Sequence, residues 1–220
     1  MRALLTGVVV CALCGGAWAA DVVVEETPDA GPVAASPTFD GTLELKWDNG
    51  IPIWLITYYT GSGSWVGNDF DISTISAYRN VESMRIFSGP TWPNGRWEGW
   101  RLGIYSFTAV PGSLLWGPKY VIGTSSNYAW NNFAVNWTLP APNTAFVAAL
   151  EQFYDYPNMD AHCVDNNLTF LRHTWLYYGG TWGPYSNSKG YYNLMLRVVV
   201  NNETLAVAPA SLGRVKALYR

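Results

Sequence analysis

Charged residues and cysteine are scarce in this chain, and the shortage of charge excludes two classes of protein. Only 13% of the 220 residues are charged, and 13 Lys and Arg stand against 16 Asp and Glu, a net charge of −3. A nucleic-acid-binding surface needs clustered cations, so nucleic acid is not expected as a partner. Disorder throughout the chain is also excluded, because the net charge is low and 15% of the residues are aromatic.

Catalytic and metal-binding signatures are missing as well. The chain has no H-E-x-x-H motif, no Walker A motif, no dinucleotide-binding glycine pattern and no G-x-S-x-G motif. His162 and Cys163 are adjacent, but neighbouring side chains on a strand point to opposite faces, which disfavours a Cys–His nucleophile. No catalytic residue is therefore predicted.

The first 19 residues have the pattern of a secretory signal peptide. Met1-Arg2 supplies the positive charge, an apolar run extends to about Gly15, and Ala17-Trp18-Ala19 is a small-x-small cleavage site. The apolar run is short for a transmembrane helix, and no later segment is long and apolar enough to span a membrane. We expect a secreted, extracellular or cell-surface protein, with an uncleaved N-terminal anchor as the alternative.

Composition divides the rest of the chain into three parts. Residues 20–38 contain prolines and acidic residues but no aromatic residue, which predicts a flexible linker. Residues 39–201 contain all but one of the 12 tryptophans and form the expected domain. Residues 202–220 form a C-terminal tail.

Cleavage of the signal peptide would leave Cys163 as the one remaining cysteine. An internal disulfide is then excluded, so stability must come from the core. A buried thiol is the favoured interpretation of Cys163, and self-association through an intermolecular disulfide is the alternative.

Apolar and polar residues alternate with a period of two, which predicts β-strands. Leu43, Leu45 and Trp47 form one such set, and Asn49-Gly50 then predicts a hairpin turn to a return strand over 51–59. Further strands are expected over 81–87, 99–109, 120–122, 133–139, 145–153, 168–178 and 191–200.

The last of these runs is the most apolar and predicts a central strand. Leu194, Leu196, Val198 and Val200 should share one face of it. About eight or nine strands without a long amphipathic helix predict an all-β fold, an antiparallel β-sandwich of jelly-roll type.

Acidic residues near turns are candidates for a structural calcium site. Asp69 and Asp71 lie on one side of an extended segment, and Asp160 and Asp165 lie in a loop rich in oxygen ligands, which Ca²⁺ prefers. Neither segment matches the EF-hand loop. Solvated turn residues are the alternative, and no other cofactor is expected.

Aromatic residues beside turns are the most informative feature. An exposed indole ring is costly unless it packs or binds something. Flat rings can stack on the apolar faces of sugars without any catalytic group; the alternative is that these rings fold back over the ends of the sandwich. The candidate ligand-binding residues are Trp92, Trp97, Trp100, Trp116, Trp130, Trp175, Trp182 and Tyr178.

Much of the chain resembles jelly-roll accessory modules on exported proteins of environmental bacteria. The resemblance rests on Trp47-Asp48-Asn49-Gly50, Pro111-Gly112, and the segments 146–153, 156–160 and 194–198. It implies attachment to sugar or to a surface.

The prediction is a secreted, non-catalytic β-sandwich module that recognises carbohydrate through loop aromatic residues. The first alternative is a structural or assembly subunit of a cell-surface structure, held by edge strands or by Cys163. A lesser alternative is a glycoside hydrolase, which needs two facing carboxylates in a cleft.

Overall fold

The computed structural model describes residues 8–9, 22–26, 41–58, 62–88, 98–123, 128–165, 172–185 and 192–202. These residues form 15 strands and one short 3-10 helix, η1 (Ser73–Ile75), and every strand pairing is antiparallel. The predicted all-β, antiparallel fold is confirmed. More strands form than the expected eight or nine because segments such as 64–71 and 162–165, which lack regular alternation, are also paired.

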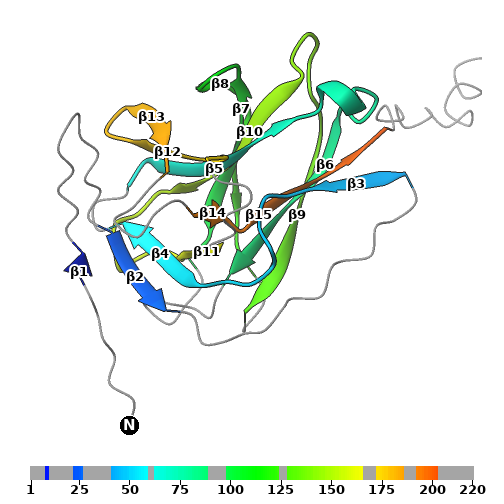
Figure 1. Ribbon diagram of the computed structural model, residues 1–220. Coiled ribbons are helices and arrows are strands. Elements are labelled where there is room, and N and C mark those ends of the chain that lie inside the picture. The colour runs from blue at the N-terminus through cyan, green and yellow to red at the C-terminus, as the bar shows by residue number, and fades with distance from the viewer. Residues whose placement is uncertain are drawn as a thin grey trace, which may run out of the picture.

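The largest sheet has six strands, in the order β13-β12-β5-β10-β7-β8. In Figure 1 the hairpin of β12 and β13 lies at one end of this sheet and β8 at the other. The strands are β5 (Ser64–Asp71), β7 (Trp100–Phe107), β8 (Pro111–Val121), β10 (Ala145–Gln152), β12 (Thr174–Tyr178) and β13 (Thr181–Pro184).

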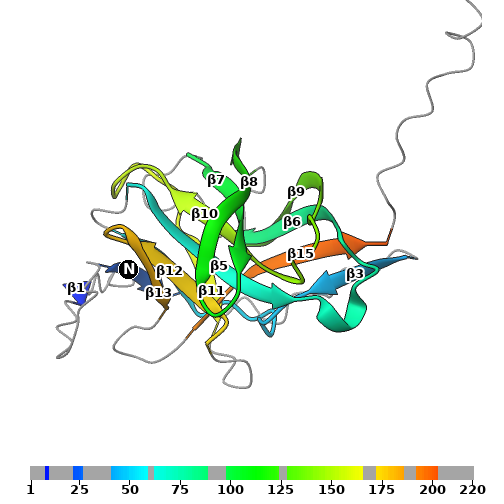
Figure 2. The same cartoon turned by 90° about the horizontal axis from the view of Figure 1, so that it is seen from above.

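A second sheet has four strands, in the order β3-β15-β6-β9. Figure 2 shows β3 and β15 on the side of the molecule away from the β12–β13 hairpin. The strands are β3 (Thr42–Leu45), β6 (Asn80–Ser88), β9 (Ala129–Thr138) and β15 (Leu196–Asn201).

The third sheet has the order β1-β2-β4-β11-β14. Its strands are β1 (Val8–Val9), β2 (Val22–Glu26), β4 (Trp54–Tyr58), β11 (His162–Asp165) and β14 (Asn193–Leu194). β2 belongs to the segment predicted as a flexible linker, and β1 to the predicted signal peptide. Without β2, the backbone groups on that side of β4 would be unpaired, so a short valine-rich segment can pair there.

The main core lies between the sheets. Leu102 and Phe146 of the six-stranded sheet and Ile86 and Val198 of the four-stranded sheet are all fully buried in it. Burying one side chain of this size stabilises the fold by roughly 1.5–3 kcal/mol, so many such residues can hold a domain without disulfides. Within the described residues, no helix is long and apolar enough to cross a membrane.

The apolar run near the end of the domain is central, as predicted, but it is split between two sheets. β15 lies between β3 and β6, and its alternate residues point into the main core. At Met195 the chain leaves the third sheet: its N–H donates to the carbonyl of Cys163 and its carbonyl accepts from Phe87. The Asn68 side chain on β5 donates to the carbonyls on either side of Met195, at 2.9 and 3.0 Å, and so stabilises the crossing.

The predicted hairpin at Asn49-Gly50 is wrong. β3 pairs with β15, whereas β4 pairs with β2 and β11, so this segment crosses between sheets. The turn itself is tight: Asp48 accepts the N–H of Gly50 at 2.9 Å, and Asn49 accepts the N–H of Ile51 at 2.8 Å. An Asn-Gly pair predicts a turn, but which strands the turn joins depends on distant partners.

Cys163 is fully buried in the third sheet, which confirms the favoured interpretation of a buried thiol. An intermolecular disulfide at this position would require that sheet to open. Burial of the thiol therefore disfavours covalent self-association of the folded domain through Cys163.

Candidate functional site

The two faces of the six-stranded sheet carry different hydrophobic clusters. On β5, for example, Val66 belongs to the main core and Trp65 to a separate cluster on the opposite face, as strand alternation requires. We call this opposite side the aromatic face. Its rings are Trp65, Tyr105, Phe107, Trp175, Tyr177 and Trp182.

The aromatic face is concave. The rings of Trp182 on β13 and Tyr105 on β7 have centroids 5.1 Å apart, although their strands are four places apart in the sheet. In a flat sheet such strands would be about 19 Å apart. The β12–β13 hairpin must therefore curl over the face. The contact of Trp175 with Phe107, at 5.5 Å, supports the same curvature.

Trp65 forms the floor of this concave face. Only 8% of it is exposed, and Tyr105 packs edge-on against it at 5.3 Å. A Cβ at Gly103 would lie 2.9 Å from Cζ3 of Trp65, so the indole reaches across β10 and lies over that glycine. The other five rings of the face are partly exposed, so the surface is preorganised and still accessible.

An acidic and a basic side chain flank one end of the aromatic face. Nη1 of Arg101 lies 3.2 Å from Oε2 of the buried Glu151, and its guanidinium also lies over the ring of Phe153. Burial raises the pKa of the Glu151 carboxyl, although Arg101 opposes the shift. Burial also raises the pKa of the Tyr105 hydroxyl above its ordinary value of 10.

Asp69 holds the other end of the aromatic face. Nε1 of Trp175 donates to Oδ1 of Asp69 at 2.8 Å, and Nδ1 of His173 lies 3.0 Å from Oδ2. The imidazole of His173 stacks on Trp47 with 3.6 Å between ring centroids. These contacts fix the orientation of the Trp175 indole.

The predicted binding residues are only partly brought together. Trp175 and Trp182 lie on the aromatic face, whereas Tyr178 points to the other side of β12 and packs against Tyr58 in the core. Trp116 packs against the main core. Trp92 and Trp97 lie outside the described residues.

Trp100, a candidate ligand-binding residue, is not available to a ligand. It begins β7, is fully buried, and donates from Nε1 to the carbonyl of Asp160 at 3.3 Å. Its position has the same parity as Leu102 and Ile104, which also face the core. The nearby turn signals obscured this alternation.

Four rings of the aromatic face were not among the predicted binding residues. Trp65, Tyr105, Phe107 and Tyr177 each alternate with core residues on their strands. Aromatic residues at alternate positions opposite a core-facing set were the signal that could have found them.

The acidic residues of the two segments proposed for calcium each accept hydrogen bonds from protein groups. Asp71 accepts the N–H of Ser73, and Asp160 accepts the N–H groups of Glu98 and Gly99. Asp165 accepts from the N–H of Asn49 and from the Asn193 side chain, and Asp69 holds Trp175 as described above. In the described part of the chain, no group of three His, Cys, Asp or Glu could hold a metal ion. The structure thus gives the calcium hypothesis no support.

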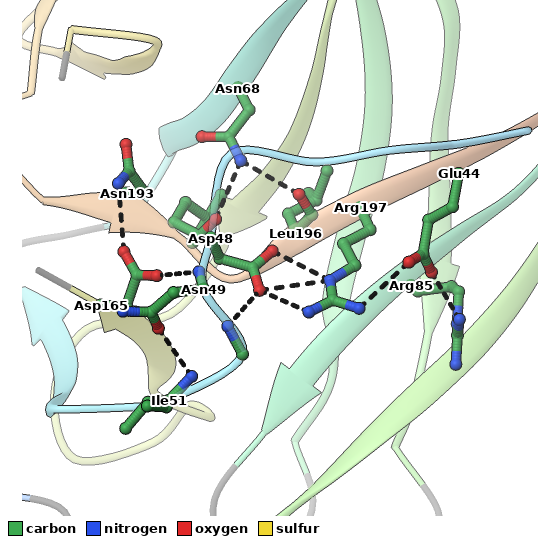
Figure 3. A network of polar contacts seen from close by, with 12 residues as sticks. Glu44, Asp48, Asn49, Ile51, Asn68, Arg85, Asp165, Asn193, Leu196 and Arg197 are labelled. Carbon is green, nitrogen blue, oxygen red and sulfur yellow. Dashed lines mark hydrogen bonds and ion pairs between the residues drawn. The ribbon is translucent and has the colours of Figure 1, made fainter. Parts of the chain in front are cut away.

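The outer face of the four-stranded sheet carries a network of charges that we call the ionic face, shown in Figure 3. Arg197 donates to Asp48 from Nη2 at 2.6 Å and from Nε at 3.0 Å, and its Nη1 donates to Glu44 at 3.1 Å. Glu44 also pairs with Arg85, which lies directly across from Arg197 in the sheet.

Trp130 covers the ionic face. Its ring centroid lies 4.0 Å from the guanidinium carbon of Arg197, and it packs edge-on against Phe87 at 5.4 Å. Trp130 was predicted to bind ligand, but its ring is engaged by these two side chains. With Arg197 and Asp48 buried and paired, the ionic face is a structural unit rather than a recognition surface.

Comparisons of this chain with protein-family models, with curated proteins and with solved structures find no match. The geometry of the aromatic face is therefore the observation on which a functional conclusion rests.

Proposed function

We propose that this protein is a secreted, non-catalytic β-sandwich module that binds carbohydrate on the aromatic face. The observation that carries the proposal is a concave set of six aromatic side chains fixed on a rigid sheet. Partly exposed rings offer flat apolar surfaces to the C–H faces of sugars. Arg101 and Asp69 stand at the two ends, where hydrogen-bonding groups can meet sugar hydroxyls.

The same geometry argues against glycoside hydrolysis by the carboxylates that flank the face. Glu151 pairs with Trp65 and Val147 pairs with Asp69, so Glu151 and Asp69 are offset by four residues along adjacent strands. That offset is about 13 Å, whereas the two carboxyl groups of a glycosidase stand roughly 5–9.5 Å apart. Binding without chemistry fits this spacing better.

Self-assembly through the edges of this sheet is also disfavoured. β8 pairs with β7 through three register shifts and carries Pro118 and Lys119 along its exposed side. β13, at the other edge, has only four residues and ends in Pro184. Bulges, prolines, charges and short length all protect an edge from further pairing. A monomer in light scattering, with and without reductant, would exclude the assembly alternative.

Titration with glycans tests the proposed function. Isothermal titration and tryptophan fluorescence would be followed with soluble neutral polysaccharides of glucose, xylose and mannose. We expect one of them to bind, and Trp182→Ala to weaken its binding at least tenfold by removing a ring from the face. Trp137→Ala, the same change on the four-stranded sheet, is the control and should leave the affinity within twofold. Absence of heat and of a fluorescence change with every polysaccharide would overturn the proposal.

A further inference from the structure

A pocket of about 360 Å³ opens beside the aromatic face, where β12 turns into β13. It is lined by residues 62–64, at the start of β5, and by residues 177–180 of the β12–β13 hairpin. This volume lies at the small end of the range for ligand pockets, which is roughly 300–1,000 Å³. The pocket therefore suits a small ring rather than a large ligand.

Glycines line part of the pocket and border open space. A Cβ added at Gly63 or at Gly180 would meet no atom within 4 Å, so the backbone there borders empty space. Gly179 and Gly180 both have positive φ, which suits the tight two-residue turn of this hairpin. Tyr177 lines the pocket and also packs against Trp182 at 5.4 Å, which makes the pocket continuous with the aromatic face.

The pocket offers polar groups but no ionised side chain among its described lining residues. Its lining residues are two serines, two tyrosines and three glycines. Oδ1 of Asp155 accepts the N–H of Ser62 at 2.9 Å and so places a negative charge at the rim. An anionic ligand would be repelled there, whereas an uncharged polyhydroxylated ring would not.

Exposed aromatic rings lie next to Ser62, one of the residues that line the pocket. Oγ of Ser62 donates to the carbonyl of Phe153, and the ring of Phe153 contacts both Tyr154, at 4.5 Å, and Tyr120, at 5.6 Å. Tyr120 and Tyr154 are 54% and 51% exposed. Rings that contact neighbours on one side and face solvent on the other are suited to stacking on a ligand.

We propose that this pocket is the subsite for one uncharged sugar residue, and that the glycan leaves it across Phe153 toward Tyr154 and Tyr120. The inference rests on the proposed function and deepens it by naming the ligand class, a neutral glycan. The pocket then determines the kind of sugar bound, and the rings on either side bind the rest of the chain.

A matched pair of glycine substitutions tests the pocket. Gly63 and Gly41 have φ of +82° and +85°, and neither would place a Cβ closer than 4.0 Å to another atom. Asparagine tolerates positive φ, so Gly63→Asn and Gly41→Asn impose a similar backbone cost. The probes are neutral hexasaccharides of β-1,4-linked glucose, xylose or mannose. We expect Gly63→Asn to weaken binding at least tenfold and Gly41→Asn to change it less than twofold.

A second substitution and two further probes extend the test. If urea denaturation shows that Gly63→Asn does not fold, Gly179→Asn replaces it, because an Asn-Gly pair suits this turn. Tyr154→Ala should weaken binding of the hexasaccharide at least fivefold and of the corresponding disaccharide less than twofold. A disaccharide of galacturonic acid, short enough to stay in the pocket beside Asp155 and not reach Arg101 over Phe153, should bind at least tenfold more weakly than the neutral disaccharide.

The outcomes separate the two proposals. If the wild-type protein binds a neutral hexasaccharide and the pocket variant binds it equally well, the pocket proposal is overturned and the proposed function stands. Equal affinity for the galacturonic acid disaccharide and the neutral disaccharide overturns the neutral class. Equal losses of both chain lengths in Tyr154→Ala overturn the direction of the chain. If the wild-type protein binds none of the probes or polysaccharides, both proposals fail.

Discussion

The aromatic face and the ionic face are both outer surfaces of a sheet, yet they are covered in opposite ways. On the aromatic face, rings pack against rings and most of them stay partly exposed. On the ionic face, Arg197 and Asp48 are sealed from water and every charge has a partner. Only the first arrangement leaves surface for a ligand.

The difference between the two faces follows from what it costs to expose an aromatic ring and what it costs to remove one partner of a buried ion pair. Aromatic contacts are individually weak and largely independent, so a ring can face a ligand on one side and its neighbours on the other. A buried ion pair is all-or-none, because removing one partner leaves an uncompensated charge in the interior. The predictions below test this contrast, from the largest expected effect to the smallest.

Arg197→Met should lower the free energy of unfolding by about 3–5 kcal/mol, because it leaves Asp48 buried without its cation. The matched change on the aromatic face is Arg101→Met. It also removes the partner of a buried carboxylate, Glu151. The side chain of Arg101 is 44% exposed, however, so water screens this pair, and its loss should cost less than about 1 kcal/mol. Urea denaturation of both variants measures the contrast, and equal losses would contradict it.

His162, which lies in the third sheet and on neither of the two faces, should make the fold less stable at acidic pH. Burial lowers the pKa of His162 to about 3 from its ordinary value of 6.5. Stability that depends on the neutral ring is therefore present above pH 6.5 and lost as pH falls toward 3. His162→Leu should remove this loss. The free energy of unfolding of the variant, relative to that of the wild type, should therefore rise by on the order of 3 kcal/mol between pH 7 and pH 4.

The measurement is the difference between the two proteins in urea denaturation from pH 7 to pH 4. The comparison with wild type is needed because Asp160 has the opposite effect on the pH dependence of stability. Burial raises the pKa of Asp160 to about 6, so its contribution to stability is lost as pH rises from 3.8 to 6. Parallel profiles for the variant and the wild type would show that His162 is not the sensitive group.

Tryptophans on the two faces should differ in their effect on stability. Trp130→Ala removes the cover of Arg197 and a contact with Phe87, and should cost about 3 kcal/mol. Trp182→Ala removes a partly exposed ring from a short edge hairpin and should cost about 1–2 kcal/mol. Thermal denaturation compares them; a larger loss for Trp182→Ala would reverse the contrast.

Glu151→Gln should have the smallest effect, and it should raise the free energy of unfolding rather than lower it. Because burial raises the pKa of Glu151, the folded state holds its proton to higher pH than the unfolded chain, so the ionised form lowers stability at pH 7. The variant should gain less than about 1 kcal/mol at pH 7 and lose that gain below pH 4. Asp48→Asn, measured in the same way, should be strongly destabilising at pH 7. A loss of stability in Glu151→Gln would show that its pairing with Arg101 outweighs burial.

Regular alternation predicted much of the scaffold. The expected strands over 81–87, 99–109, 133–139 and 145–153 correspond to β6, β7, β9 and β10. β5 was missed because Gly67, Asn68 and Asp69 are poor strand formers. Its Asn68 is nevertheless fully buried, since it accepts from Thr174 and donates to two backbone carbonyls of the crossing between sheets.

The candidate site was predicted only in part. Trp175 and Trp182 were identified from their place beside a glycine turn, and both lie on the aromatic face. Trp100 was assigned wrongly by the same criterion, because proximity to a turn does not tell which side of a strand a ring occupies. The floor residue Trp65 lies in the strand that was not predicted.

The sequence by itself determined that this chain is an antiparallel β protein with a disulfide-free core, because alternation and composition act locally along each strand. Only the tertiary structure decided which rings gather into one concave surface, which arginine is sealed beside Asp48, and which sheets each turn joins. Strand alternation separates two faces but cannot say which face is covered. That outcome depends on the curvature of the sheet and on partners more than a hundred residues away, such as Arg197 for Asp48 and Trp175 for Asp69.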